Sequence, residues 1–229
     1  MEQLQRTNML IDTTKLANKT VAIFGLGGVG SYVVEGLARC GIDSFVLVDF
    51  DTISITNINR HILATHKTVG ISKTKIQEQR ILDINPNAKI VVYNDKFCNE
   101  TLYNFDFSKI DYIVDAIDMV TSKILLIETA KKYNIPIICC MGTGNKLDPF
   151  AFEINDISKT SVCPLAKTMR YELRKRNIKN VPVLYSKEVI SDVQTIEEHG
   201  SRHIPGSISF VPSVAGLLIS SFVIKELLK

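Results

Sequence analysis

The sequence lacks the Cys-x-x-Cys motifs that hold structural zinc or carry thioredoxin-type redox chemistry. Its five cysteines stand at positions 40, 98, 139, 140 and 163 of the 229 residues, and no two of them have that spacing. Because both kinds of site depend on such pairs, the pattern favours reduced, unpaired thiols.

Signals for export and for membrane insertion are also missing. The first six residues, MEQLQR, are polar and have no apolar core of a secretory signal. The longest apolar run, residues 214–224, is shorter than the roughly 20 residues that span a bilayer, and it contains two serines. We therefore expect a cytoplasmic protein without a membrane partner. We interpret the run as a buried helix capped by Ser213, with Lys225 and Lys229 at its end.

The rest of the composition is that of an ordinary globular enzyme, with 45% hydrophobic residues, 22% charged residues and a formal net charge of +3. No internal repeat or low-complexity segment is present. The length allows one α/β domain with a sizeable core. We predict a single domain over residues 1–229, with a nucleotide-binding part at about 18–150 and a substrate-binding part at about 151–229.

A glycine-rich turn, GLGGVG at residues 25–30, follows an apolar segment and precedes a helix-like one. In such a turn Gly25 permits the tight bend, Gly27 and Gly28 lie where a phosphate approaches, and Gly30 lets the helix sit close to the strand. The helix N-terminus then faces the anion. A glycine turn that serves packing alone is the alternative.

The segments around this turn favour the nucleotide site. Residues 20–24 read as a buried parallel strand, residues 32–40 as a helix ending at Gly41, and residues 45–48 as a second strand. Asp49 stands 19 residues beyond Gly30, where an acid usually binds ribose hydroxyls.

Strand and helix patterns alternate through the following residues. We predict strands at 88–93, 112–118 and 137–140, and helices at 73–82 and 122–133. This order indicates a doubly wound, mostly parallel Rossmann-like sheet with helices on both faces and right-handed crossovers, followed by a basic helical C-terminal half.

The connection after the second strand carries polar side chains that a dinucleotide oxidoreductase does not need: Asp51, Asn57, Asn59, Arg60, His61 and Lys73. An arginine fork and a lysine ammonium can instead hold and neutralise the phosphates of a triphosphate as pyrophosphate leaves. Asp118 ends the fourth predicted strand at the ligand-binding edge, so it is the candidate for holding Mg²⁺ or managing the reacting phosphate. The turn at residues 141–145 is either a plain connection or a substrate-binding or ion-binding loop.

Residues 159–179 carry seven cations against a single acid, Glu172. Leu165, Met169 and Leu173 recur at helical spacing, which predicts an amphipathic helix with a basic outer face. Such a face can be merely solvated, but its single sign also fits a polyanion. The candidate substrate-binding cations are Lys167, Arg170, Arg174, Lys175 and Arg176. Residues 191–206 read as a mobile loop.

Six segments together resemble the ubiquitin-activating-type adenylyltransferase superfamily: GLGGVG at 25–30, VDFD at 48–51, NINR at 57–60, VGISK at 69–73, INP at 84–86 and DAID at 115–118. The resemblance implies an enzyme that adenylates a carboxylate with ATP and releases pyrophosphate. It implies that ATP contacts the glycine turn, Asp49 and Asp51, Asn57, Arg60 and Lys73, and Asp118. Catalysis would rest on Arg60, Lys73 and an Asp118 that holds Mg²⁺, and a monovalent cation could accompany the nucleotide.

Within that superfamily the chain resembles the branch that cyclises threonylcarbamoyladenosine beside the tRNA anticodon. The segments that carry this resemblance are Arg6-Thr7, Asn59-Arg60 and residues 141–149, 164–170 and 205–213. It implies tRNA as partner, a homodimer, and a sulfur-transfer or cysteine desulfurase partner. It also implies that Arg6 reaches the ATP of the second copy; an exposed N-terminal arginine without a role is the alternative.

Three other functions stay open. An adenylyltransferase for the C-terminal glycine of a ubiquitin-like sulfur carrier would share the ATP residues, although this chain has no Cys-x-x-Cys pairs and no appended sulfurtransferase domain. Cys163 lies in a segment where some relatives hold a reactive thiol. It is either a thiol whose pKa is lowered by its basic surroundings or a small apolar residue. An oxidoreductase would use Asp49 for NAD. A non-catalytic tRNA-binding module would need the basic helix and not Asp118.

Overall fold

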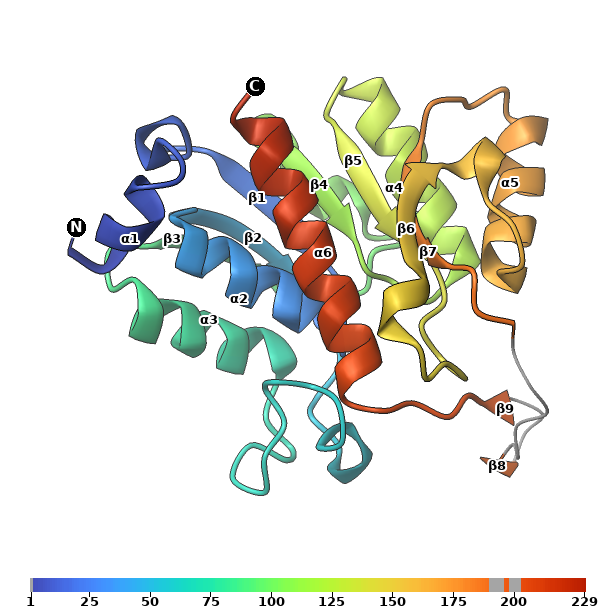
Figure 1. Cartoon of the computed structure of the whole chain (residues 1–229), viewed down its shortest axis with the longest axis horizontal. Helices are drawn as coiled ribbons and strands as arrows, with labels where there is room; N and C mark the ends of the chain where they lie inside the picture. The colour runs from blue at the N-terminus through green and yellow to red at the C-terminus, as the bar shows by residue number, and fades with distance from the viewer. Residues whose placement is uncertain (1, 190–195, 198–202) are drawn as a thin grey trace.

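The computed structural model describes residues 2–189, 196–197 and 203–229. Its centre is a seven-stranded sheet with the order β3-β2-β1-β4-β5-β7-β6 (Figure 1). The strands are β1 (Thr20–Phe24), β2 (Ser44–Val48), β3 (Lys89–Tyr93), β4 (Tyr112–Asp115), β5 (Ile137–Cys140), β6 (Phe152–Asp156) and β7 (Pro182–Ser186). All neighbouring strands pair in parallel except β6 and β7. The predicted doubly wound, mostly parallel sheet is therefore confirmed.

Six α-helices lie within the described residues: α1 (Gln5–Asn8), α2 (Gly30–Cys40), α3 (Lys73–Ile84), α4 (Val120–Lys132), α5 (Pro164–Lys175) and α6 (Phe210–Leu227). Short 3-10 turns stand at η1 (Glu2–Leu4), η2 (Thr13–Lys15), η3 (Ile55–Asn57), η4 (Leu102–Asn104), η5 (Pro149–Ala151) and η6 (Ile157–Lys159). A separate pair of two-residue strands, β8 (Ile196–Glu197) and β9 (His203–Ile204), is antiparallel.

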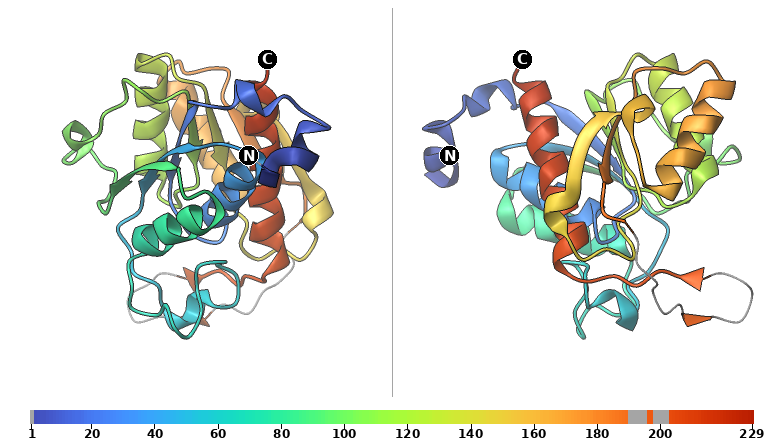
Figure 2. Two further views of the ribbon diagram at one scale, coloured as in Figure 1. Left: turned by 90° about the vertical axis from the view of Figure 1, so that its left-hand side faces the viewer. Right: turned by 45° about the vertical axis from the view of Figure 1, so that its right-hand side comes forward.

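Alternate residues of the central strands point into two different hydrophobic cores. Val21 and Ile23 of β1 join α2 and α6 in the first core. Ala22 and Phe24 join α4, α5 and an aromatic cluster in the second. The views in Figure 2 show these helix pairs on opposite sides of the sheet. Because a strand reverses its side-chain direction at each residue, the two apolar faces require helices on both sides, as predicted.

The apolar run near the C-terminus forms α6, which is longer than predicted. The helix begins after Ser209, so Ser213 lies inside it and is not its cap. By length and composition alone α6 could cross a membrane. In this fold it packs along α2, where a side-chain carbon at Gly36 would lie 2.3 Å from Oγ of Ser220. Such close packing makes α6 a helix of the first core.

The C-terminal half is less helical than predicted, because β6 and β7 extend the same sheet. The basic helix is also shorter than the 159–179 segment: η6 precedes it, and α5 begins at Pro164, a residue favoured in a first helical turn. The predicted loop at 191–206 falls largely on residues 190–195 and 198–202, which lie outside the described residues.

The strand order reverses between β1 and β4, which lead to opposite halves of the sheet. Open α/β sheets bind ligands in the crevice that forms at the carboxyl ends of such strands. The connections after β1, β2 and β4 all begin at this edge.

Candidate functional site

A cavity of about 650 Å³ opens at the carboxyl ends of β1, β2 and β4. Nine of the eleven predicted nucleotide-binding residues line it: Gly25, Gly27, Gly28, Asp49, Asp51, Asn57, Arg60, Lys73 and Asp118. These residues come from three separate connections, so the fold brings together side chains that are up to 93 positions apart. Gly30 and Arg6 are the two that do not line the cavity.

The glycine turn has the close approaches that its sequence predicts. Gly25 has a φ of +91°, and a side-chain carbon there would lie 2.6 Å from the carbonyl oxygen of Ala116. At Gly30 such a carbon would lie 1.8 Å from the carbonyl oxygen of Gly25. The turn therefore tolerates no larger residue at these two positions, and the first turn of α2 lies directly against it.

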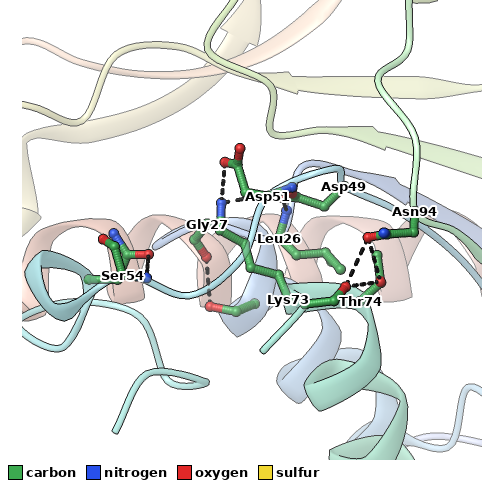
Figure 3. A network of polar contacts seen from close by, with 11 residues as sticks. Leu26, Gly27, Asp49, Asp51, Ser54, Lys73, Thr74 and Asn94 are labelled. Atoms are coloured by element: carbon green, nitrogen blue, oxygen red, sulfur yellow. Dashed lines mark hydrogen bonds and ion pairs between the residues drawn. The ribbon is translucent and has the colours of Figure 1, made fainter. Parts of the chain in front are cut away.

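The carboxylate of Asp49 is occupied by backbone groups. Its Oδ2 accepts a hydrogen bond of 2.6 Å from the amide of Leu26, and its Oδ1 accepts one of 2.9 Å from the amide of Asp51 (Figure 3). Only 8% of Asp49 is exposed. Asp49 thus ties the glycine turn to the connection after β2.

Lys73 stands between two carboxylates at the first turn of α3. Its Nζ lies 2.6 Å from Oδ2 of Asp51 and 3.6 Å from Oδ1 of Asp49, and its side chain is almost fully buried (Figure 3). The side chain of Asp51 is 48% exposed toward the cavity that it lines. Lys73, Asp49 and Asp51 thus form one charged cluster at the edge where the cavity opens.

Arg60 follows η3, a turn that Asn57 closes by accepting a hydrogen bond of 3.1 Å from the amide of Ser54. Nη1 of Arg60 donates to the carbonyl oxygen of Thr56 at 3.0 Å and to Oδ1 of Asn59 at 2.8 Å. Partial burial lowers the pKa of Arg60, but a guanidinium stays protonated in proteins. The two contacts hold the fork in place and use only one of its three nitrogens.

Asp118 is exposed at the cavity and lies in the sequence between the two members of a buried ion pair, Asp115 and Lys123. The Nζ of Lys123 lies 3.0 Å from Oδ2 of Asp115 and donates to the carbonyl oxygens of Ile117 and Cys140 at 3.0 Å and 2.8 Å. Burial opposes the charge of Lys123, but the Asp115 carboxylate outweighs it and raises the pKa of the ammonium. The pair fixes the backbone that presents Asp118.

The described residues contain no group of three histidine, cysteine or acidic side chains that could hold a metal by themselves. One free carboxylate, Asp118, is nevertheless the donor set that Mg²⁺ uses when nucleotide phosphates supply its other ligands.

His61, to which the sequence analysis gave no separate role, also lines the cavity. The residue is 7% exposed, and its Nδ1 is buried without a hydrogen-bond partner. Burial, together with the charges of Arg60 and Lys73, lowers its pKa to about 3. The only signal in the sequence was its position directly after Arg60.

The predicted substrate-binding cations on α5, and Arg176 directly after it, differ in their surroundings. Arg170 donates to the carbonyl oxygen of Thr160, and Arg176 pairs with Glu172 at 2.6 Å and with Glu128 at 3.2 Å. Lys175 lies over the ring of Tyr171 and 3.9 Å from Glu172. Lys167 and Arg174 are exposed and have no such partner within the described part of the chain. The predicted apolar stripe faces inward, with Met169 and Leu173 buried.

Two other candidates lie away from the cavity. Arg6 is exposed on α1, next to Leu4, whose side chain contacts Gly41 at the opposite, amino end of β2 (Figure 1). Cys163 is 3% exposed and packs in the second core, which favours the apolar alternative. The turn after β5 does reach the cavity, through Thr143.

Comparison with known proteins identifies the family. The ThiF family model matches residues 3–229. A tRNA threonylcarbamoyladenosine dehydratase of Bacillus subtilis (strain 168) is 42% identical over 227 residues, covering 93% of this chain and 89% of that protein.

Solved structures agree with the sequence relatives. Crystal structures of the E. coli tRNA N6-threonylcarbamoyladenosine dehydratase in complex with ATP and with AMP match with TM-scores of 0.89 and 0.87 at 29% identity. The matches cover 99% of this chain and 93% and 94% of those chains. With the predicted fold and superfamily both confirmed, the chain belongs to the ThiF family.

Proposed function

We propose that this protein is an ATP-dependent tRNA threonylcarbamoyladenosine dehydratase. The observation that carries the proposal is the single cavity in which a glycine turn, two cations and a free carboxylate converge at the switch point of the sheet. The similarity to dehydratases over nearly the whole chain, including a relative solved with ATP, supports the choice of this reaction within the family.

ATP fits the residues that line the cavity. The turn at Gly25–Gly30 offers backbone donors and space for phosphates, and Arg60 and Lys73 supply positive charge beside it. The ribose contact is expected for Asp49, whose two oxygens each accept one backbone hydrogen bond and can accept another, with the half-exposed carboxylate of Asp51 beside it at the cavity. Mg²⁺ would be held by Asp118 together with the phosphates and would neutralise their charge.

The reaction begins with attack of the threonyl carboxylate of the modified adenosine on the α-phosphorus of ATP. Pyrophosphate leaves, and the carboxylate becomes an acyl adenylate with AMP as leaving group. A nucleophilic atom of the same side chain then closes a ring, and the net change in the nucleoside is loss of water. Arg60 and Lys73 contribute by stabilising the negative charge that builds on the departing phosphates.

tRNA would lie along α5 with its anticodon loop at the cavity. A side-chain carbon at Gly142 would lie 4.0 Å from Cβ of Leu165, so the first turns of α5 are close to the end of β5. Lys167 stands in those turns and Arg174 lies two turns, or roughly 10 Å, further along, so both cations can reach phosphates of one backbone. The loop can present an unstacked base to the cavity. This arrangement would place the tRNA-binding surface within residues 151–229, as predicted from the sequence.

The protein would act in the cytoplasm as a homodimer. Arg6 lies at the amino edge of its own sheet and the cavity at the carboxyl edge, so an Arg6 that reaches ATP must do so in a second copy. A sulfur-transfer or cysteine desulfurase partner remains a prediction. Cys163 would have to leave the second core before it could accept sulfur from one.

The test is turnover with defined tRNA. The protein is incubated with ATP, Mg²⁺ and tRNA that carries threonylcarbamoyladenosine, and the nucleosides are analysed by mass spectrometry. We expect loss of one water from that nucleoside and formation of AMP in equal amount. Equal AMP formation with unmodified tRNA, or faster adenylation of a carrier protein that ends in Gly-Gly, would replace the dehydratase by a sulfur-carrier adenylyltransferase.

A further inference from the structure

One histidine that lines the cavity has a buried ring nitrogen without a hydrogen-bond partner in the described part of the chain. Nδ1 of His61 is shielded from solvent and makes no hydrogen bond with the described residues. The residue as a whole is only 7% exposed. Buried polar groups are nearly always paired, so an unpaired one in a cavity points to a constraint other than stability. For His61 we look to the opposite edge of the ring, which carries Cε1 and Nε2.

The Cε1–Nε2 edge of the imidazole faces the second glycine of the turn. A side-chain carbon placed at Gly27 would lie 3.7 Å from Cε1 and 3.8 Å from Nε2. Nε2 is therefore next to the backbone that a phosphate must approach, and both His61 and Gly27 line the cavity.

The position of the ring proton follows from this placement. A neutral imidazole carries its proton on one nitrogen and accepts through the other. A buried N–H without an acceptor is rarer in proteins than an acceptor without a donor. The proton therefore belongs on Nε2, at the cavity, and the lone pair on the buried Nδ1.

We propose, on the basis of the ATP site described above, that Nε2–H of His61 donates a hydrogen bond to a phosphate oxygen of the nucleotide at Gly27. The side chain acts as an uncharged donor beside the cations Arg60 and Lys73. It orients the polyphosphate without adding a third positive charge that would hold pyrophosphate after it forms.

The proposal is tested by binding of ATP and of adenosine to the whole protein, measured by titration calorimetry. His61→Ala should weaken ATP binding by roughly 10- to 100-fold, the range for loss of a hydrogen bond to a charged group, and leave adenosine binding within about twofold. His61→Gln, which keeps an N–H donor, should stay within about fivefold of the parent for ATP. His66→Ala is the matched control, because His66 is an exposed histidine in the same connection.

Three other outcomes separate the failure of this hydrogen bond from the failure of the proposed function. Equal ATP affinity of parent and His61→Ala would overturn the hydrogen bond and leave the proposed function intact. Equal weakening of ATP and adenosine, or no recovery in His61→Gln, would make the ring a packing element. A parent that binds no ATP would instead sink the proposed function itself.

Discussion

The ammonium of Lys123 lies 3.0 Å from the carboxylate of Asp115, and neither side chain is exposed at all. The pair sits between β4 and α4, and the same ammonium donates to the carbonyl oxygen of Ile117, one residue before Asp118. A buried charge pair between the sheet and α4 thus sets the path of the backbone that carries the proposed magnesium ligand.

Removing the ammonium alone should destabilise the protein strongly. Lys123→Met leaves the Asp115 carboxylate buried without a counter-charge, a loss of about 3–5 kcal/mol for such pairs. Denaturant unfolding followed by circular dichroism measures it. The double variant Lys123→Met with Asp115→Asn should recover a large part, because it removes both charges.

The matched control is Lys132→Met, an exposed lysine in the last turn of the same helix, which should change the unfolding free energy by less than about 0.5 kcal/mol. If Lys123→Met and Lys132→Met unfold at the same denaturant concentration, the buried pair does not stabilise this fold.

Asp118→Asn should lower AMP formation by roughly 100- to 1,000-fold, because the amide keeps the shape but cannot neutralise a metal ion or match its preference for charged oxygen. Arg60→Ala and Lys73→Ala should each lower it by roughly 10- to 1,000-fold through loss of a preorganised charge. Rates are measured as AMP released from labelled ATP. Asp106→Asn, an exposed acid outside the cavity, serves as control, and full activity of Asp118→Asn would remove that residue from the reaction.

Much of this cavity was predictable because its signals are local. A strand, a glycine turn and a helix follow one another within residues 20–40, and the closest contact at Gly30 is to the carbonyl oxygen of Gly25 inside that unit. The role of Asp49 was not predictable in the same way. Spacing identifies an acid after the second strand, but Asp49 and Asp51 both satisfy it. The structure shows how they differ: Asp49 accepts hydrogen bonds from the amides of Leu26 and Asp51, and Asp51 pairs with Lys73.

The sheet edge beyond β5 was missed for a different reason. β6 exposes most of its residues partly and buries only Phe152 firmly, so it carries no run of apolar residues. Its place is set by antiparallel pairing with β7, in which Phe152 lies opposite Ser186, and no local pattern encodes a partner that distant. The N-terminal start of α6 was predicted too late in the sequence, because Phe210 and Pro212 extend the helix upstream of the apolar run.

Acid should destabilise the protein partly through His61. Its pKa is about 3 in the folded protein against 6.5 ordinarily, with burial as the main cause, Arg60 and Lys73 adding to it and Asp51 opposing it. Between these values the unfolded chain binds a proton that the folded chain does not. The free energy of unfolding therefore falls by up to about 1.4 kcal/mol for each pH unit below 6.5. This decrease levels off near pH 3, and His61 has no such effect above about pH 7.5.

Denaturant unfolding at pH 7.5 and pH 5.0 separates this contribution from that of the carboxylates. His61→Gln cannot take up the proton, so it should lose about 2 kcal/mol less than the parent between these two pH values. Identical losses would mean that His61 is protonated in the folded protein as readily as in the unfolded one.

Reversing the two unpaired cations of α5 should weaken tRNA binding while leaving the fold unchanged. Lys167→Glu with Arg174→Glu should lower affinity at least tenfold at 0.1 M salt, and should reduce the slope of log affinity against log salt by roughly 1.4–1.8, about 0.7–0.9 per phosphate contact. Filter binding at several salt concentrations measures both. Lys75→Glu with Lys89→Glu changes two exposed cations on α3 and β3 as the matched control, and equal effects of the two pairs would leave α5 a solvated face.

The proposed reach of Arg6 into a second copy can be tested by mixing two inactive variants. Arg6→Ala should lose most of its AMP formation, as expected when a charge at the phosphates is removed. In a mixed dimer with Asp118→Asn, one cavity has an intact Asp118 and receives an intact Arg6 from the other chain. Half of the dimers are mixed at equal concentrations and each has one such cavity, so activity should return to about a quarter of the parent. Arg6 acting within its own chain would give no return, because each cavity would then carry one of the two substitutions.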